Sequence, residues 1–135
     1  MRIILFTLLC ISICQAKAGD LAPYAIPDDQ EEKAQFCMAW TQDAMQATEK
    51  RLQGVDPVKL MGLIDSIPDE LLPPDAKERA QSAIGWAYTY PMDMIETGEM
   101  AEIRCNACID EINPIPCLKK FDEALSKVDR SEINF

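Results

Sequence analysis

The chain of 135 residues contains no histidine. Histidine titrates near neutral pH and is the commonest metal ligand, so its absence excludes Ser-His-Asp and Cys-His catalysis and most zinc sites. The five glycines are scattered, which leaves no glycine-rich phosphate loop, P-loop or EF-hand pattern. The acidic residues fall at expected helix starts and on solvated faces rather than in catalytic pairs. The sequence therefore indicates a protein that is not an enzyme and that uses no cofactor or metal.

Basic residues are also few, because 13 lysines and arginines stand against 23 acidic residues and give a formal net charge of −10. Nucleic acids and anionic membranes would repel such a chain, so neither is expected as a partner. The charge is compatible with a basic partner, and equally with an acidic surface that is simply well solvated.

Residues 1–18 have the pattern of a secretory signal peptide. Arg2 supplies a positive start, the run from Ile3 to Ile13 is almost entirely apolar, and Ala16-Lys17-Ala18 fits a small-x-small cleavage site. The run is short for a membrane span, which takes about 20 apolar residues, and an uncleaved anchor is the alternative. Cleavage after Ala18 would leave 11 basic and 23 acidic residues, a net charge of −12. We therefore expect a secreted or periplasmic protein.

Prolines and helical periodicity divide the rest of the chain. Residues 19–29 contain two prolines and predict an extended N-terminal arm that Tyr24 and Ile26 pack onto the body. Residues 30–128 predict a helical domain, and residues 129–135 a C-terminal tail. We expect helices near 30–53, 57–67, 75–90, 92–112 and 117–128. No segment alternates over strand length, so the sequence predicts an all-α bundle of about five helices.

Two of these helices have extended apolar stripes, which we expect to face the core. The stripe of the first helix consists of Ala34, Cys37, Met38, Thr41, Ala44, Met45, Thr48 and Leu52, with Phe36 and Trp40 on a neighbouring stripe. The stripe of the fourth consists of Ile95, Gly98, Ala101, Glu102, Cys105, Cys108, Ile109 and Ile112, where Glu102 is the exception.

Four cysteines remain after the expected cleavage: Cys37, Cys105, Cys108 and Cys117. An even set in an exported chain predicts disulfides. Cys108 lies one turn before the Pro114/Pro116 corner and Cys117 just after it, so a bridge between them would fix the corner. Cys105 faces the same way as Cys108 and would then reach Cys37. The swapped pairing, Cys37–Cys108 with Cys105–Cys117, is the main competitor.

Two other interpretations of the cysteines remain open. Cys105-x-x-Cys108 has the spacing of a thiol–disulfide exchange motif, although it follows no strand, and Glu102 and Asp110 nearby would disfavour a thiolate. A zinc site of four thiolates is the other, although no second C-x-x-C exists.

The methionines and aromatic residues suggest where a partner would bind. Tyr88, Tyr90, Met92 and Met94 cluster around Pro91, where the third helix must break, and tyrosine and methionine are frequent at interfaces. This cluster is our candidate binding surface. The favoured function is an exported, non-enzymatic protein that binds another protein through a rigid helical surface, as inhibitors, immunity proteins and chaperones do. A carrier of a small apolar ligand is the alternative, and thiol–disulfide exchange is a third hypothesis.

Overall fold

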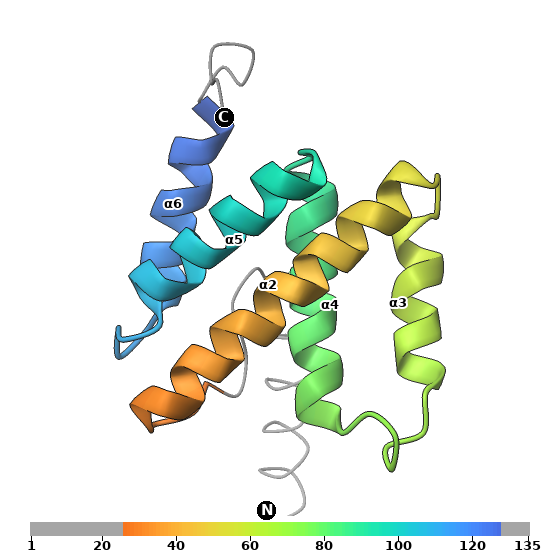
Figure 1. Cartoon of the computed structure of the whole chain (residues 1–135), viewed down its shortest axis with the longest axis horizontal. Coiled ribbons are helices and arrows are strands. Elements are labelled where there is room, and N and C mark those ends of the chain that lie inside the picture. Colours follow the sequence, from red (N-terminus) through yellow and green to blue (C-terminus); the bar gives the residue numbers. More distant parts are fainter. Residues whose placement is uncertain (1–25, 128–135) are drawn as a thin grey trace, which may run out of the picture.

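The computed structural model describes residues 26–127, and within this range the chain forms five helices and no strand (Figure 1). The helices are α2 (Gln30–Leu52), α3 (Pro57–Ser66), α4 (Pro74–Thr89), α5 (Met94–Cys108) and α6 (Ile115–Lys127). The predicted all-α bundle is confirmed. The predicted signal peptide (1–18), most of the arm (19–29) and the tail (129–135) lie outside the described residues. Within the arm, Ile26 packs against the cluster of Cys37, Cys105 and Ile109.

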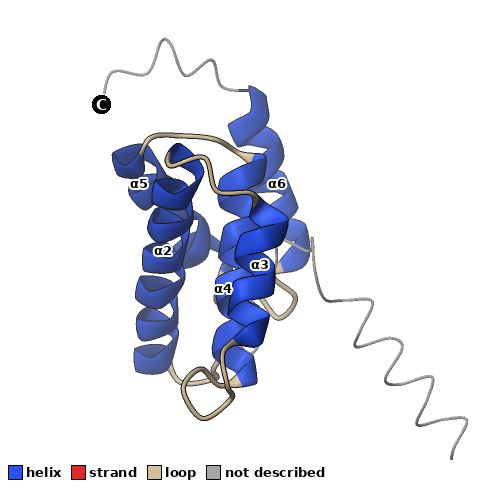
Figure 2. Ribbon diagram, turned by 90° about the vertical axis from the view of Figure 1, so that its right-hand side faces the viewer, coloured by secondary structure: helices blue, strands red, loops and turns tan. Residues whose placement is uncertain are grey.

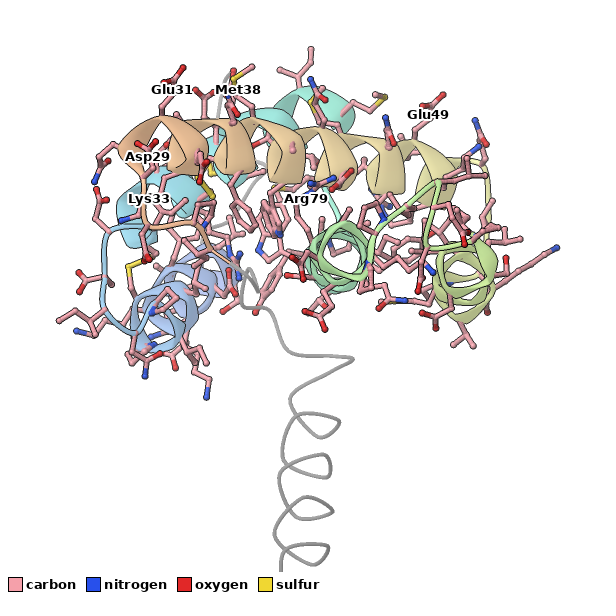
Figure 3. All side chains as sticks on the ribbon, turned by 90° about the horizontal axis from the view of Figure 1, so that it is seen from below. Asp29, Glu31, Lys33, Met38, Glu49 and Arg79 are labelled. Atoms are coloured by element: carbon pink, nitrogen blue, oxygen red, sulfur yellow. A yellow bond between two sulfur atoms is a disulfide. The ribbon has the colours of Figure 1, made fainter. Side chains whose placement is uncertain are left out.

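The helices form two layers. α2 and α5 make one layer, and α6, α4 and α3 make the other, which Figure 3 shows beneath α2. α2 and α5 are antiparallel, because Cys37 near the start of α2 bonds Cys105 near the end of α5, while Thr48 near the end of α2 meets Thr97 near the start of α5. α3 lies alongside α4 (Figure 2), where Leu60, Met61 and Ile64 pack against the cluster of Ala47, Ile84 and Ala87. None of the residues of α3 is fully buried.

Aspartate caps set where three of the helices begin. Asp29, Asp56 and Asp93 each accept a hydrogen bond from a backbone N–H of the following turn, which stabilises a helix start. Gly54 follows the end of α2 with a φ of 81°, a conformation that costs little only without a Cβ. Most of these boundaries agree with the sequence prediction.

Three boundaries differ from the prediction by more than one residue. The helix expected over 92–112 is α5, Met94–Cys108, which ends four residues earlier than predicted. It begins two residues later than predicted, because the Asp93 carboxylate accepts the N–H of Glu96 and caps the helix. The helix expected from Cys117 is α6, which begins at Ile115. The side chain of Asn113 accepts the Ile115 N–H, and Pro116 falls in the first turn, where the missing N–H of proline costs nothing.

A buried ion pair joins the two layers at the centre of the core. Arg104 of α5 donates from Nε (2.9 Å) and Nη2 (3.0 Å) to the two carboxylate oxygens of Asp122 in α6. Trp86 donates to the same carboxylate at 2.9 Å. The guanidinium carbon lies 4.9 Å from the ring centroid of Trp40 and 5.5 Å from that of Trp86. Four helices thus meet on one charged group that solvent does not reach, since the Arg104 side chain is 1% exposed.

The four cysteines in the described part of the chain form two bridges, Cys37–Cys105 and Cys108–Cys117, with Cα atoms 5.6 Å apart in each. This is the preferred pairing of the sequence analysis. The first bridge fastens α2 to α5, and the second fastens α5 to α6 across the proline corner. Both distances lie within the range that disulfides span without backbone movement.

Candidate functional site

The outer face of the α2–α5 layer carries exposed apolar side chains. Met38 is 64% exposed, Leu52 61% and Ile95 68%. All three were predicted to face the core, and that prediction is wrong, as it is for Ile112, which lies fully exposed beyond α5. The reason is that the second layer covers only the inner side of the pair, where Trp40 and Ala44 occupy the core. In Figure 3, Met38 points away from the other helices, on the same side as Glu31 and Glu49.

The α2 side of this face has a regular spacing. Ala34, Met38, Thr41, Met45, Thr48 and Leu52 alternate at four and three residues, which is the a/d pattern of a coiled-coil seam. Two residues of this row, Met45 and Thr48, pack on α5. Thr48 Oγ1 lies 2.9 Å from Thr97 Oγ1, and the Met45 sulfur lies 3.0 Å from where a Cβ on Gly98 would be. Met38 and Leu52, toward the two ends of this row, remain mostly exposed.

A groove runs between the two helices at the disulfide end of this seam. It has a volume of about 340 Å³. Its lining consists of Ala34, Cys37, Met38, Thr41, Gln42, Glu102 and Asn106. Because Cys37 is bonded to Cys105, the two walls of the groove are held together covalently. We call this groove, together with Met38, Met45, Leu52 and Ile95, the outer seam.

Thr41 offers a test of the packing in the groove. Its hydroxyl is buried and has no hydrogen-bond partner. A buried hydroxyl without a partner costs about 1–3 kcal/mol, so Thr41→Val, which replaces the hydroxyl by a methyl group, is expected to raise the free energy of unfolding by about 1 kcal/mol. Urea denaturation measures the change. Thr41→Ser, which keeps the hydroxyl, serves as the control, and a gain in the serine variant would contradict the explanation.

The outer seam is acidic. Glu31 and Glu49 of α2 and Glu99 and Glu102 of α5 are exposed. The four basic residues of α2 and α5 are all directed elsewhere. Lys33 pairs with Asp110, Arg51 donates to the Met92 carbonyl, Lys50 lines a different groove, and Arg104 is buried. Among the described residues of α2 and α5, the charged side chains that flank the outer seam are therefore all carboxylates.

A second groove, which Lys50 lines, lies on the other flank of α2, against α3 and α4. It has a volume of about 210 Å³. Its lining consists of Asp43, Gln46, Ala47, Lys50, Leu60, Ile64, Ala80 and Ile84. The floor is apolar, and the polar side chains come mainly from α2.

Asp43 at the edge of this second groove gives a prediction for pH dependence. Burial raises the pKa of the Asp43 carboxyl above its ordinary value of 3.8, although the hydrogen bond from Arg79 at 2.8 Å opposes the shift. The folded chain therefore holds this proton more tightly than the unfolded chain. The stability that Asp43 contributes is full below 3.8 and falls as pH rises through the raised native pKa.

Asp43→Asn removes this titration. The unfolding free energies of the two proteins are measured by urea denaturation across the acidic range. The wild type should lose stability relative to Asp43→Asn as pH rises, so the difference between the two values is smaller at low pH than at high pH. A wild type that gains stability relative to Asp43→Asn as pH rises would contradict the prediction, as would an NMR titration midpoint for Asp43 below 3.8.

The four residues of the predicted binding surface around Pro91 lie in different environments. Met92 is 6% exposed and belongs to the cluster of Trp40 and Trp86, so its assignment to a binding surface is corrected. Tyr90 is half-buried against the same cluster. Tyr88 packs on the other side with α3 and donates to the Val55 carbonyl at 2.7 Å, and Met94 is half-buried. The four side chains do not form one continuous face.

The two cysteines of the Cys105-x-x-Cys108 motif are not bonded to each other. Cys105 and Cys108 each bond a cysteine of another segment, and they are 2% and 1% exposed.

Within residues 26–127, no three or more carboxylate or thiol side chains are placed to hold a metal ion. Over the same range no helix combines the length and the apolar character needed to cross a membrane. Disulfides of this kind are typical of oxidising compartments such as the periplasm or the extracellular space.

The apolar residues of the outer seam were predicted from the sequence but assigned to the core, whereas Gln42, Asn106, Arg104 and Asp122 were not predicted. A signal for the Arg104–Asp122 pair exists in the sequence. Arg104 lies three residues after Ala101 and four before Cys108, on the buried stripe of its helix, and Asp122 lies between Leu118 and Leu125. Opposite charges on the apolar stripes of two consecutive helices indicate an internal ion pair.

Comparison with known proteins found no protein-family model, no curated protein and no solved structure that matches the chain.

Proposed function

We propose that this chain is an exported, non-enzymatic binding protein whose outer seam docks another protein. The observation that carries the proposal is the exposure of Met38, Leu52 and Ile95 on one face of two disulfide-linked helices. Large apolar side chains that gather on one rigid face are typical of protein interaction sites. The disulfides support an extracellular or periplasmic site of action, because such bonds persist in oxidising compartments.

The rigidity of the face favours binding. The Cys37–Cys105 bond lies beside the groove, and the buried Arg104–Asp122 pair holds the inner side of α5. A surface that is already ordered loses little conformational entropy when it binds, so more of the contact energy appears as affinity.

A photo-crosslinking amino acid placed at position 38 tests the proposal, with position 58 on α3 as the control because Val58, at 79%, is even more exposed than Met38, at 64%. The chain, expressed in its source, is expected to crosslink one partner from position 38 and not from position 58. The identified partner is then purified, and Met38→Asp should weaken its complex by at least about tenfold, as for an interface hot spot. Equal capture from both positions would contradict the proposal.

The second groove, between α2, α3 and α4, favours a second candidate function, the carriage of a small apolar ligand. Its walls come from Leu60, Ile64 and Ile84, and its volume of about 210 Å³ suits a short apolar chain. Displacement of a fluorescent lipophilic probe tests this function. Ile84→Trp fills the groove and should abolish probe binding, and retention of the probe by this variant would exclude the groove as its site.

A further inference from the structure

We infer that the partner of the outer seam is a basic amphipathic helix that lies in the groove between α2 and α5. This inference rests on the proposed function and adds the chemistry of the partner. Three properties of the seam carry it: its spacing, its charge and its shape.

The spacing of the seam is that of a helix-packing surface. Met38, Met45 and Leu52 recur every seven residues along α2, and Ile95 and Gly98 face them from α5. Seven-residue spacing keeps an apolar row facing one partner helix along its whole length. From Met38 to Leu52 the row is about 21 Å long, which matches about two heptads of a docked helix.

The charge of the seam selects the partner. Glu49 and Glu102, with Glu31 and Glu99 further out, flank the apolar row, and the lysines and arginines of α2 and α5 are all directed elsewhere. A helix with acidic flanks would place like charges opposite one another and be repelled. A helix with lysine or arginine beside its apolar stripe complements the seam and approaches faster at low salt.

The shape of the seam admits a helix. The groove of about 340 Å³ opens between α2 and α5, and Gly98 lets Met45 lie close to the α5 backbone, where a side chain at position 98 would lift it. A third helix placed there would pack on both α2 and α5, as the helices of a three-helix coiled coil pack on one another.

A designed peptide of about 21 residues, three heptads, tests the inference. It carries leucine at its a and d positions and lysine at its flanking positions, and fluorescence anisotropy measures its binding. A second peptide carries glutamate in place of lysine, and a third has the composition of the first in scrambled order. The basic amphipathic peptide is expected to bind the mature chain at micromolar Kd, and at least about tenfold more tightly than either control.

Three variants locate the site. Met38→Asp with Leu52→Asp is expected to weaken binding by at least about tenfold, because it places charge in the apolar row. Glu49→Gln with Glu102→Gln should weaken binding about threefold and reduce its salt dependence. The matched control is Val58→Asp with Leu63→Asp on α3, whose side chains are 79% and 53% exposed, and it should change the Kd less than about twofold.

The inference is overturned if the basic peptide does not bind, if the scrambled or acidic peptide binds as tightly, or if the α3 variant loses as much affinity as the seam variant. The proposed function fails separately, when a crosslinker at position 38 finds no specific partner. If it finds one that docks by a loop or an acidic surface, the proposed function stands and the inference fails.

Discussion

Replacing Asp122 by alanine is expected to lower the free energy of unfolding by about 3–5 kcal/mol, the loss observed when one member of a buried ion pair is removed. Arg104 would keep its charge beneath Trp40 and Trp86 but would lose both hydrogen bonds to the Asp122 carboxylate, and bulk water does not compensate for the loss because the Arg104 side chain is 1% exposed. Trp86 would also lose the acceptor for its indole N–H. A loss of this size is a large part of the 5–15 kcal/mol typical of a whole domain.

Urea denaturation followed by tryptophan fluorescence measures this loss directly, since both tryptophans of the chain contact the ion pair. The informative control removes both charges. Arg104→Met with Asp122→Leu leaves no unpaired ion and should recover most of the loss, because apolar pairs of similar size often replace buried ion pairs without cost. A loss below about 1 kcal/mol in Asp122→Ala would mean that the pair behaves as an exposed one and would contradict its role.

The second large effect is expected from the Cys37–Cys105 bridge. It closes a loop of 68 residues, whereas Cys108–Cys117 closes one of 9. In the loop-entropy model the stabilisation grows with the logarithm of loop length, which gives about 4.4 kcal/mol for the long loop and about 2.6 kcal/mol for the short one. Replacing Cys37 and Cys105 together by alanine should therefore cost more than replacing Cys108 and Cys117 together.

Each double variant keeps the other bridge, so the two unfolding free energies compare one loop at a time. Thiol counting on the folded proteins verifies that the remaining bridge is oxidised. If the short bridge proved the more stabilising, the local geometry of the proline corner, rather than the entropy of the unfolded chain, would control the effect.

Local signals in the sequence were sufficient for the helices. Asp29 and Asp56 cap their helices through their own next turn, Gly54 ends α2, and Pro91 breaks the chain after α4. These features depend on residues within a few positions of one another. The spacing of the cysteines was also informative, because helix geometry and the corner after Cys108 restrict which sulfurs can meet.

The direction that each apolar stripe faces was predicted less well. The stripe of α2 contains Met38 and Leu52 as well as Cys37 and Ala44, and periodicity alone does not tell which half a neighbouring helix covers. In the structure Trp40, assigned to a neighbouring stripe, is fully buried and shifts the core toward α4. The second layer therefore decides which half of the stripe is exposed, and its position depends on contacts far apart in the sequence.

Contacts far apart in the sequence also decide the fate of the binding surface predicted around Pro91. A helix break such as that at Pro91 predicts where the chain turns, but Met92 turns inward because the cluster of Trp40 and Trp86 offers it apolar contacts. An Arg104–Asp122 pair requires α6 to fold back onto α5, which the Cys108–Cys117 bridge and the corner bring about. The opposite charges on the two apolar stripes indicate the pair, but the packing of α6 on α5 that brings the charges together depends on contacts across the corner.

The division of α2 and α5 into an inner and an outer side has an evolutionary consequence. The inner side carries Trp40 and Arg104 and packs against Trp86 and Asp122 of the second layer, and substitutions there are expected to be costly. Outer positions such as Met38, Leu52 and Ile95 contribute little to folding, because exposed substitutions usually change stability by less than about 0.5 kcal/mol. Mutation can therefore change the chemistry of the outer face while the scaffold stays constant, so descendants of one such chain can diverge at this surface before they diverge in fold.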